Sequence, residues 1–435
     1  MDYSTKKFLG WTGLIVLILI PVYLWFAFGD PGSFATYGDS VHSFGELFGL
    51  IGMTCFALTF VLSTRIKSIE DIFGGLDKVY IVHGILGGTA LIFLLAHPIF
   101  LVLKFIPSNW ALAASYLLPS QYWSTNFGII ALFGMLILIW ITLYTKMKYH
   151  RWKFTHEFLG LIFIIAVLHI FLVRGEASEG IIFAGYYVYA AVVSIIGLGA
   201  FLYSLFIKNR AIKNAVYKIK EIKNIGEIFE IILIPEHKPI SYNSGQFIFV
   251  RFYNKKLSTE SHPFSIASKS DNYEIKIVVK KLGDFTKKII YLNPGDKVSI
   301  EGPYGRFNFK GYKNKNQIWL GSGIGVVPFL GMAEEVGNHN LKVDFFYTER
   351  NKNDFIGLPI LEEAQKNSKN FRFFPWVSNE KGRINIHNIK KLSGDLSNKD
   401  FLICGSPGFK ESIINQLLEV GVKRSQIHEE VFDFR

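Results

Sequence analysis

Six apolar runs, each long enough to cross a bilayer as a helix, occupy the first half of this 435-residue chain. They cover residues 8–28, 45–64, 79–103, 126–145, 154–173 and 181–206. A helix needs about 20 predominantly apolar residues to cross the hydrocarbon core, where only helices and closed barrels satisfy every backbone hydrogen bond. The chain is therefore expected to begin with a bundle of six transmembrane helices.

Lys and Arg residues are unequally distributed between these runs. With the N-terminus placed inside, the outer loops carry only Lys104 and Arg174, whereas the inner segments carry nine basic residues: Lys6, Lys7, Arg65, Lys67, Lys78, Lys146, Lys148, Arg151 and Lys153. An excess of Lys and Arg marks the cytoplasmic side of a membrane protein. The pattern predicts a multi-pass protein of the plasma membrane with both termini in the cytoplasm.

The second half of the chain differs in charge and in periodicity. Residues 207–435 hold 36 Lys and Arg against 25 Asp and Glu, whereas residues 1–206 hold 11 against 10. Short β-type runs at 227–234, 246–252, 274–280 and 297–301 predict an antiparallel barrel. From about residue 316, apolar strand-like runs alternate with helical stretches, which predicts a parallel α/β sheet.

Two other features limit the class of protein. The chain has only two cysteines, which excludes a disulfide scaffold and a cysteine-ligated iron–sulfur cluster, since such a cluster takes about four thiolates. The basic stretch from Lys208 to Lys223 fits a junction near anionic head groups, or equally well a solvated helix or strand face. We expect no nucleic-acid partner and no obligatory protein partner.

Four histidines lie inside the third and fifth apolar runs, where polar side chains are costly and usually functional. His83 and His97 are 14 residues apart and His156 and His169 are 13 apart, which is about 20 Å along a helix. Because the two runs cross in the same direction, His83 can lie level with His156, and His97 with His169. Two facing imidazoles at each of two depths are the ligands that two stacked b-type haems require. The alternative is that these are scattered histidines with ordinary hydrogen bonds.

An ideal helix places both histidines on one face in the third run but not in the fifth. Fourteen residues turn an ideal helix by nearly a whole number of turns, so His83 and His97 share a face. Thirteen residues leave His156 and His169 about 140° apart. We therefore expect a local bulge or kink in the fifth run, unless the haems approach that helix from different sides.

One segment of the predicted barrel carries a candidate flavin contact. Residues 261–268 read Ser-His-Pro-Phe-Ser-Ile-Ala-Ser, and Pro263 restricts the backbone so that Phe264 and Ser265 continue as an extended edge. An aromatic ring followed by a hydroxyl can cover an isoalloxazine and hydrogen-bond its reactive nitrogen, although the segment could be an ordinary strand start. Downstream, Gly283 and Thr286 belong to a glycine turn before a predicted helix, a weak signal for a diphosphate site.

The α/β region opens with an apolar strand that runs into a glycine-rich turn, Gly-Ser-Gly-Ile-Gly-Val-Val-Pro at 321–328. Gly321, Gly323 and Gly325 let the backbone approach a pyrophosphate, and the next helix offers its N-terminus. The pattern departs from G-x-G-x-x-G because the third glycine comes one residue early and Pro328 follows it by three. This turn is the candidate nucleotide site.

Two further strands end in candidate nucleotide contacts. Arg350 follows the next predicted strand and can reach an adenosine ribose or 2′-phosphate, or serve only as a surface salt-bridge residue. Cys404 and Gly405 end another buried strand at the carboxyl edge of the sheet, where nucleotides bind in open α/β folds. Cys404 could instead be only a small buried hydrophobe.

In combination, these features resemble the NADPH oxidase / ferric reductase superfamily, and within it the bacterial NADPH oxidases most. The similarity extends from about residue 45 to the end. It rests on the six apolar runs, the two histidine spacings, the glycine turn at 321–325, and the segments His-Pro-Phe-Ser at 262–265 and Cys-Gly-Ser-Pro at 404–407. It implies a six-helix transmembrane di-haem domain at 1–207, a ferredoxin-NADP-reductase-like β-barrel FAD domain at 208–312 and an NAD(P)H-binding α/β domain at 313–435.

The resemblance also implies roles for individual residues. His83 and His156 hold the inner haem, His97 and His169 the outer one, and Arg174 is the candidate for the outer propionates. The flavin is lined by His262, Pro263, Phe264 and Ser265, with Gly283 and Thr286 near its diphosphate. The nicotinamide nucleotide contacts Gly321, Gly323, Gly325, Pro328, Arg350, Cys404 and Gly405. Ser265, Cys404 and Phe432 act where the hydride passes, and Phe432, or else Phe434, stacks on the flavin.

The implied activity is electron transfer from cytoplasmic NADPH or NADH through FAD and two b-type haems to external dioxygen, which yields superoxide. A ferric or cupric chelate reductase with the same electron path is the first alternative, although the loops 29–44 and 105–124 show no Cys/His metal cluster. The second alternative is a non-enzymatic membrane scaffold or transporter with a nucleotide-sensing domain, which would be colourless.

Overall fold

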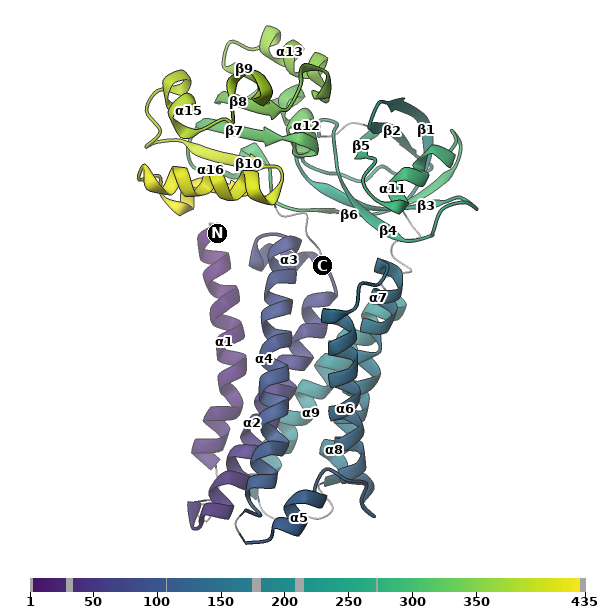
Figure 1. Ribbon diagram of the computed structural model, residues 1–435, viewed down its shortest axis with the longest axis vertical. Coiled ribbons are helices and arrows are strands. Elements are labelled where there is room, and N and C mark those ends of the chain that lie inside the picture. Colours follow the sequence, from purple (N-terminus) through teal and green to yellow (C-terminus); the bar gives the residue numbers. More distant parts are fainter. Residues whose placement is uncertain are drawn as a thin grey trace. The chain divides into compact units, whose positions relative to one another are not determined.

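The computed structural model describes residues 3–28, 34–106, 108–173, 181–207, 215–270 and 273–430. It contains two compact units, Met1–Asn209 and Arg210–Arg435. The first unit is helical, and the second combines two β-sheets with helices (Figure 1).

The first unit is a multi-pass membrane bundle. Six stretches of its described residues are helices long and apolar enough to cross a membrane, as predicted. They are formed by α1 (Tyr3–Phe28), α2 (Tyr37–Ser63), α4 (Leu76–Leu103), α6 (Trp123–Tyr144), α7 (Tyr149–Glu157) with α8 (Leu159–Val173), and α9 (Ile181–Leu202) with a π-helical turn at Tyr203–Ile207. The short helices α3 (Lys67–Phe73) and α5 (Trp110–Ser115) lie in the connections.

Small residues set how closely α2 packs against α4. A Cβ atom added to Gly52 would lie 2.7 Å from a side-chain carbon of Leu94, and one added to Gly45 would lie 2.9 Å from Leu101. Gly49 stands between them at a spacing of four and three residues. Glycines repeated on one helix face let two membrane helices approach closely, so this stripe fixes α2 on the face of α4 that carries the histidines.

The fifth span is interrupted between its two histidines. Helix α7 ends at Glu157 and α8 begins at Leu159. At Phe158 the backbone N–H donates to the carbonyl of Thr155, three residues back, before the regular pattern resumes with Ile162 donating to Phe158. The expected irregularity in the fifth run is therefore present, and it lies on the His169 side of His156.

The second unit contains an antiparallel sheet of six strands. They are β1 (Val216–Ile225), β2 (Ile228–Pro235), β3 (Phe247–Tyr253), β4 (Ser261–Ser265), β5 (Ile275–Lys280) and β6 (Lys297–Tyr304), in the order β4-β3-β6-β1-β2-β5. An antiparallel bridge between Ile266 and Ile277 joins the two edge strands, which closes the sheet around an apolar interior. The short helices α11 (Asp284–Lys287) and η4 (Lys288–Tyr291) follow β5. The predicted barrel is confirmed.

Strand β1 explains part of the basic stretch. Tyr217 and Ile219 are buried while Lys218 and Lys220 are exposed, the alternation expected of a strand with one solvated face. Lys218 lies 2.8 Å from Glu236 on the neighbouring part of the sheet. The basic residues of this stretch that the structure describes therefore lie on the solvated face of a strand.

A parallel α/β sheet forms the rest of the second unit, as predicted. Its strands are β7 (Asn316–Ser322), β8 (Lys342–Glu349), β9 (Phe371–Val377), β10 (Asp400–Cys404) and β11 (Ile427–Glu429), in the order β11-β10-β7-β8-β9. The helices are α12 (Val327–Val336), α13 (Leu358–Asn367), α14 (Ser378–Lys381), α15 (Ile386–Ser393) and α16 (Pro407–Glu419), with 3₁₀ turns at Phe309–Gly311, Gly323–Val326 (η6), Lys352–Asp354 and Arg424–Gln426. Separate apolar clusters cover its two faces, which is why these strands read as continuous apolar runs.

Candidate functional site

The four membrane histidines meet in two pairs. The ring centres of His83 and His156 are 6.1 Å apart with planes inclined by 59°. Those of His97 and His169 are 6.4 Å apart and inclined by 70°. The pairs are the ones that the sequence spacing predicts, and each joins α4 to the interrupted fifth span.

Hydrogen bonds fix the orientation of three of these rings. Nδ1 of His83 lies 3.0 Å from the carbonyl oxygen of Thr59. Nδ1 of His97 lies 2.7 Å from the carbonyl oxygen of Gly45, and Nδ1 of His169 lies 2.8 Å from that of Ser124. A carbonyl oxygen only accepts, so each Nδ1 carries the proton and each Nε2 keeps its lone pair. Such bonds are what orients metal-bound histidines.

His156 reaches the same tautomer by another route. Its Nδ1 lies 3.4 Å from the hydroxyl oxygen of Thr142, and that hydroxyl donates its own proton to the carbonyl of Leu138. The Thr142 oxygen can therefore only accept from His156. The ring also stacks on Trp152, with centres 5.3 Å apart and planes inclined by 9°.

Both pairs have the spacing of two axial ligands on one iron. A metal–imidazole bond of about 2 Å and about 1 Å from nitrogen to ring centre, counted on both sides, put the ring centres about 6 Å apart. Glycines make room for the outer rings, since a Cβ on Gly49 would lie 2.9 Å from His97 Nδ1 and one on Gly128 would lie 2.8 Å from the His169 ring. The donor set and its spacing fit two bis-histidyl b-type haems. Arg174 lies outside the described residues.

The two predicted flavin segments come together on the barrel. His262 in β4 stacks on Phe285 in α11, with ring centres 3.7 Å apart and planes inclined by 29°. Burial lowers the pKa of His262, against the opposing charges of Glu260 and Asp284, so this imidazole is held towards its neutral form. Phe264 packs on the barrel interior, and Ser265 is buried.

The turn before α11 is held by Thr286. Its hydroxyl oxygen accepts hydrogen bonds from the backbone N–H groups of Leu282 (3.0 Å) and Gly283 (2.9 Å). No atom lies within 4 Å of the place where a Cβ of Gly283 would be. The turn is therefore locally rigid and open beside Gly283.

The glycine-rich turn lies between β7 and α12 at the carboxyl edge of the parallel sheet. Gly321 pairs with Cys404 across β7 and β10, and Gly323 has a φ of +59°, a conformation that favours glycine. A Cβ on Gly325 would lie 2.6 Å from backbone atoms of Cys404 and Gly405. The early third glycine thus lets this turn pack directly on the turn after β10. Pro328 stands in the first turn of α12.

Cys404 is fully buried. Burial, assisted by the charge of Glu430, raises the pKa of its thiol well above the usual range, so the thiol stays protonated and behaves as a small apolar group. Arg350 is exposed directly after β8. Beside it, the Tyr347 hydroxyl donates to Glu349 (2.9 Å), and burial raises the pKa of that carboxyl.

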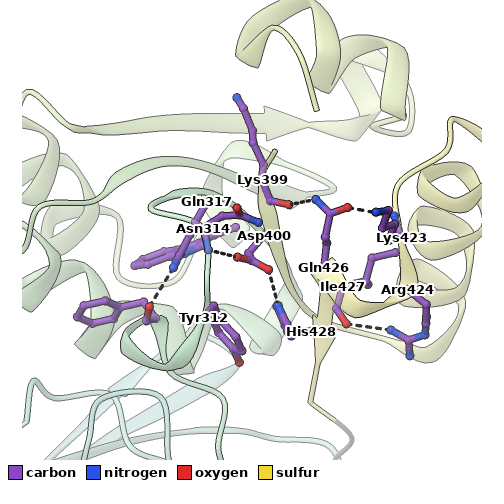
Figure 2. Close-up of polar contacts among 12 residues, drawn as sticks. Tyr312, Asn314, Gln317, Lys399, Asp400, Lys423, Arg424, Gln426, Ile427 and His428 are labelled. Carbon is purple, nitrogen blue, oxygen red and sulfur yellow. Dashed lines mark hydrogen bonds and ion pairs between the residues drawn. The ribbon is translucent and has the colours of Figure 1, made fainter. Parts of the chain in front are cut away.

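Strand β11 is anchored by a polar cluster that leads to the C-terminal segment (Figure 2). Asp400 accepts hydrogen bonds from the backbone of Asn314 (2.7 Å) and from His428 Nε2 (2.8 Å). Tyr312 stacks on His428 with ring centres 3.7 Å apart. The cluster holds β11 through His428, and Phe432 and Phe434 lie outside the described residues.

Family models match three consecutive parts of the chain. A ferric reductase like transmembrane component matches residues 48–167, an FAD-binding domain matches 211–308 and an oxidoreductase NAD-binding domain matches 319–414. These are the domains that the fold separates, in the same order. The chain belongs to the NADPH oxidase / ferric reductase superfamily.

Curated relatives of this superfamily member are distant and longer. Dual oxidase 1 of Caenorhabditis elegans is 31% identical over 241 residues, which cover 50% of this chain and 15% of that protein. Dual oxidase 2 of Rattus norvegicus is 25% identical over 292 residues, 62% of this chain and 19% of that one. The heavy chain of a superoxide-generating NADPH oxidase of Dictyostelium discoideum is 25% identical over 176 residues, 33% and 25% of the two chains. The chain spans a quarter or less of each.

Sequence reasoning did not identify the groups that orient the histidines. The carbonyls of Gly45, Thr59 and Ser124 have no side-chain signature, because every residue carries a carbonyl. One signal was available for the outer pair, since Gly45 and Gly49 form a G-x-x-x-G pattern inside an apolar run.

Proposed function

We propose that this protein is a transmembrane NAD(P)H oxidase that passes electrons from cytoplasmic NAD(P)H through FAD and two b-type haems to external dioxygen. The observation that carries the proposal is the pair of facing histidine couples, each with the spacing and tautomer of two axial haem ligands. The names of two relatives, a dual oxidase and a superoxide-generating NADPH oxidase, support the oxidase activity.

In this proposal, His83 and His156 hold the inner haem, and His97 and His169 hold the outer one. With two histidine nitrogens on each iron, a bound haem would offer dioxygen no open coordination position. The outer haem would supply single electrons to dioxygen without binding it, and the product would be superoxide. The N- and C-termini lie in the cytoplasm, and the membrane is the plasma membrane.

The barrel and the parallel sheet hold the flavin and the nicotinamide nucleotide. The flavin lies against β4, contacted by His262, Pro263, Phe264 and Ser265, with Gly283 and Thr286 at its diphosphate. The nucleotide lies on the carboxyl edge of the parallel sheet, contacted by Gly321, Gly323, Gly325, Pro328, Arg350, Cys404 and Gly405. Phe432, or else Phe434, is the residue assigned in this proposal to stack on the flavin. Cys404, as a neutral apolar thiol, contributes shape and not charge to the nicotinamide pocket.

The chemistry supplied by bound FAD and haem is the conversion of a hydride donor into single electrons. For each NAD(P)H oxidised to NAD(P)⁺, two electrons cross the membrane, one proton remains on the cytoplasmic side and two dioxygen molecules become two superoxide ions. The protein would orient these groups, and its four neutral histidines would hold the two haems.

The test is NADPH- and NADH-driven cytochrome c reduction by the purified, haem- and FAD-loaded protein, with and without superoxide dismutase. The oxidase proposal expects the dismutase to suppress most of the reduction. Reduction that persists with the dismutase present would contradict superoxide as the product. The His97→Ala variant is the matched control, because it removes the outer haem ligand and should abolish cytochrome c reduction in both conditions.

A ferric or cupric chelate reductase with the same electron path is the second candidate. It is favoured by the description of the model that matches residues 48–167, a ferric reductase like transmembrane component. The same assay separates the two candidates when a ferric chelate replaces cytochrome c under anaerobic conditions. Fast chelate reduction together with dismutase-insensitive cytochrome c reduction would favour the reductase.

A further inference from the structure

Helix α12 makes an unusually close contact with the barrel. It begins directly after the glycine-rich turn and lies between the parallel sheet and the barrel (Figure 1). Gly331, in its middle, is buried, and an added Cβ would lie 2.3 Å from the carbonyl oxygen and 2.7 Å from the carbonyl carbon of Ser268. The neighbour is backbone and not the end of a flexible side chain, so any side chain at position 331 has to push the two segments apart.

The segment that Gly331 contacts continues the candidate flavin strand. Residues 266–268 follow β4 without a break, and the barrel holds them firmly. The backbone N–H of Ile266 donates to Gln246 (2.9 Å) and that of Ala267 donates to Lys276 (2.7 Å). The Ser268 hydroxyl accepts from the backbone of Lys276 (3.1 Å) and lies 2.8 Å from the Tyr242 hydroxyl. This segment cannot give way without disturbing the barrel.

Two carboxylates at the end of α12 bind the same part of the barrel. Glu334 accepts from the backbone N–H of Lys269 (3.3 Å). Glu335 accepts from the Ser244 hydroxyl (2.8 Å) and from the backbone N–H of Ser270 (3.4 Å), and it forms an ion pair with Lys310. These bonds hold the C-terminal end of the helix on the barrel, while its N-terminal end carries the glycine-rich turn.

We propose that α12 is a rigid spacer between the flavin strand and the nicotinamide-nucleotide turn, and that Gly331 is a positioning residue that sets the distance for hydride transfer. This inference rests on the proposed function. The transferred hydride breaks a C–H bond of the reduced nicotinamide and forms a bond to the oxidised flavin, so its rate depends steeply on the separation of the two rings. A displacement of 1 Å can slow such a step by about 100-fold.

The displacement expected for Gly331→Ala follows from the contact itself. An ordinary van der Waals contact of a Cβ atom begins at 3.4 Å, whereas a Cβ on Gly331 would lie 2.3 Å from the Ser268 carbonyl oxygen. If this clash is relieved by moving α12 away from the barrel segment, the two must separate by up to about 1 Å. Gly337→Ala is the matched control, since this exposed glycine at the end of the same helix has Ser368 at 3.4 Å, an ordinary contact.

The experiment measures anaerobic flavin reduction by NADPH and by NADH in full-length, haem- and FAD-loaded protein. We expect Gly331→Ala to lower the limiting rate by about 10- to 100-fold, with unchanged FAD content and nucleotide affinity. Deuterium at the transferred position of the nicotinamide should slow the variant further, which identifies hydride transfer as the affected step. Gly337→Ala should match the wild type. Reduction by Gly331→Ala at the wild-type rate would overturn the proposal.

Glu335→Gln covers the case in which Gly331→Ala fails to bind FAD. It keeps the shape of the side chain and removes the charge that pairs with Lys310, so we expect a several-fold slower reduction with FAD retained. A wild-type rate in this variant would then overturn the proposal. If neither NADPH nor NADH reduces the flavin of the wild-type protein, the proposed function itself fails. That outcome is distinct from flavin reduction at the wild-type rate in the variants, which overturns only the role of α12.

Discussion

The rings of His97 and His169 face each other with centres 6.4 Å apart, and each is held by a carbonyl of a neighbouring helix, Gly45 on α2 and Ser124 on α6. Four helices therefore define one candidate iron site. The helices that supply the carbonyls do not supply the ligands, so the outer site depends on packing between α2 and α4 and between α6 and α8.

Replacing either outer histidine by alanine should remove one of two haems. We expect His97→Ala and His169→Ala to bind about half the haem of the wild type and to keep NAD(P)H-driven flavin reduction, because the second unit, Arg210–Arg435, is unchanged. Pyridine haemochrome content and the low-spin absorption spectrum measure this. His42→Ala, which changes a partly exposed histidine on α2, should leave both unchanged. Full haem content in His97→Ala would contradict the assignment.

Gly49 should be intolerant of a side chain. In Gly49→Ala the new Cβ would lie 2.9 Å from His97 Nδ1, and overpacking of this kind costs about 1–3 kcal/mol. We expect a lower unfolding temperature and a shifted spectrum of the outer haem only. Gly13→Ala on α1, where no atom lies within 4 Å of the added carbon, is the control. Equal haem spectra for Gly49→Ala and Gly13→Ala would show that the position of the His97 ring does not depend on Gly49.

Glu349 should weaken the preference for a 2′-phosphate. Its carboxyl lies at the end of β8, beside Arg350, and accepts from the Tyr347 hydroxyl. Removing a like charge should favour the phosphorylated nucleotide, so Glu349→Gln should raise the ratio of kcat/KM for NADPH to that for NADH a few-fold. The exposed Glu362→Gln on α13 should leave the ratio unchanged. A lower ratio in Glu349→Gln would contradict this role.

The contact between α12 and the barrel should weaken in acid. Burial acts to raise the pKa of Glu335, but bonds from Lys310, Ser244 and Ser270 outweigh it and lower the pKa below its usual value. A carboxylate with a lowered folded-state pKa adds stability above its usual pKa and loses it as the pH falls through the lowered value. The difference in unfolding temperature between wild type and Glu335→Gln should therefore shrink on acidification. A difference that is constant with pH would contradict this linkage.

The sequence predicts those features that depend on periodicity along the chain. The spans, most of the barrel strands, the parallel strands β7, β8 and β10 and the glycine turn follow from apolar patterns and local turn residues. Strands β1, β9 and β11 are missed for physical reasons. Strand β1 reads in the sequence as part of a basic stretch, because Lys218 and Lys220 alternate with its buried residues. Residues 371–377 contain Pro375, which weakens a strand assignment and fits the edge position that β9 occupies, and β11 is only three residues long.

Features that depend on packing between distant segments are not readable in this way. Gly331 and Ser268 are far apart in the chain, and nothing in either segment shows that their backbones meet. The break at Phe158 is expected from the spacing of His156 and His169, but its exact residue depends on how α7 and α8 pack on α6. The acceptor carbonyls of the histidines depend on helix rotation, which the apolar pattern leaves undetermined.

The central claim is that electrons pass from NAD(P)H through flavin to two bis-histidyl haems. The most direct test is to add NADPH, and separately NADH, anaerobically to the purified, haem- and FAD-loaded protein and to follow the haem spectrum. The account predicts that both haems become ferrous and six-coordinate and are reoxidised when oxygen is admitted, with two superoxide ions formed for each nucleotide oxidised. Haem that stays ferric while the flavin is reduced would contradict it.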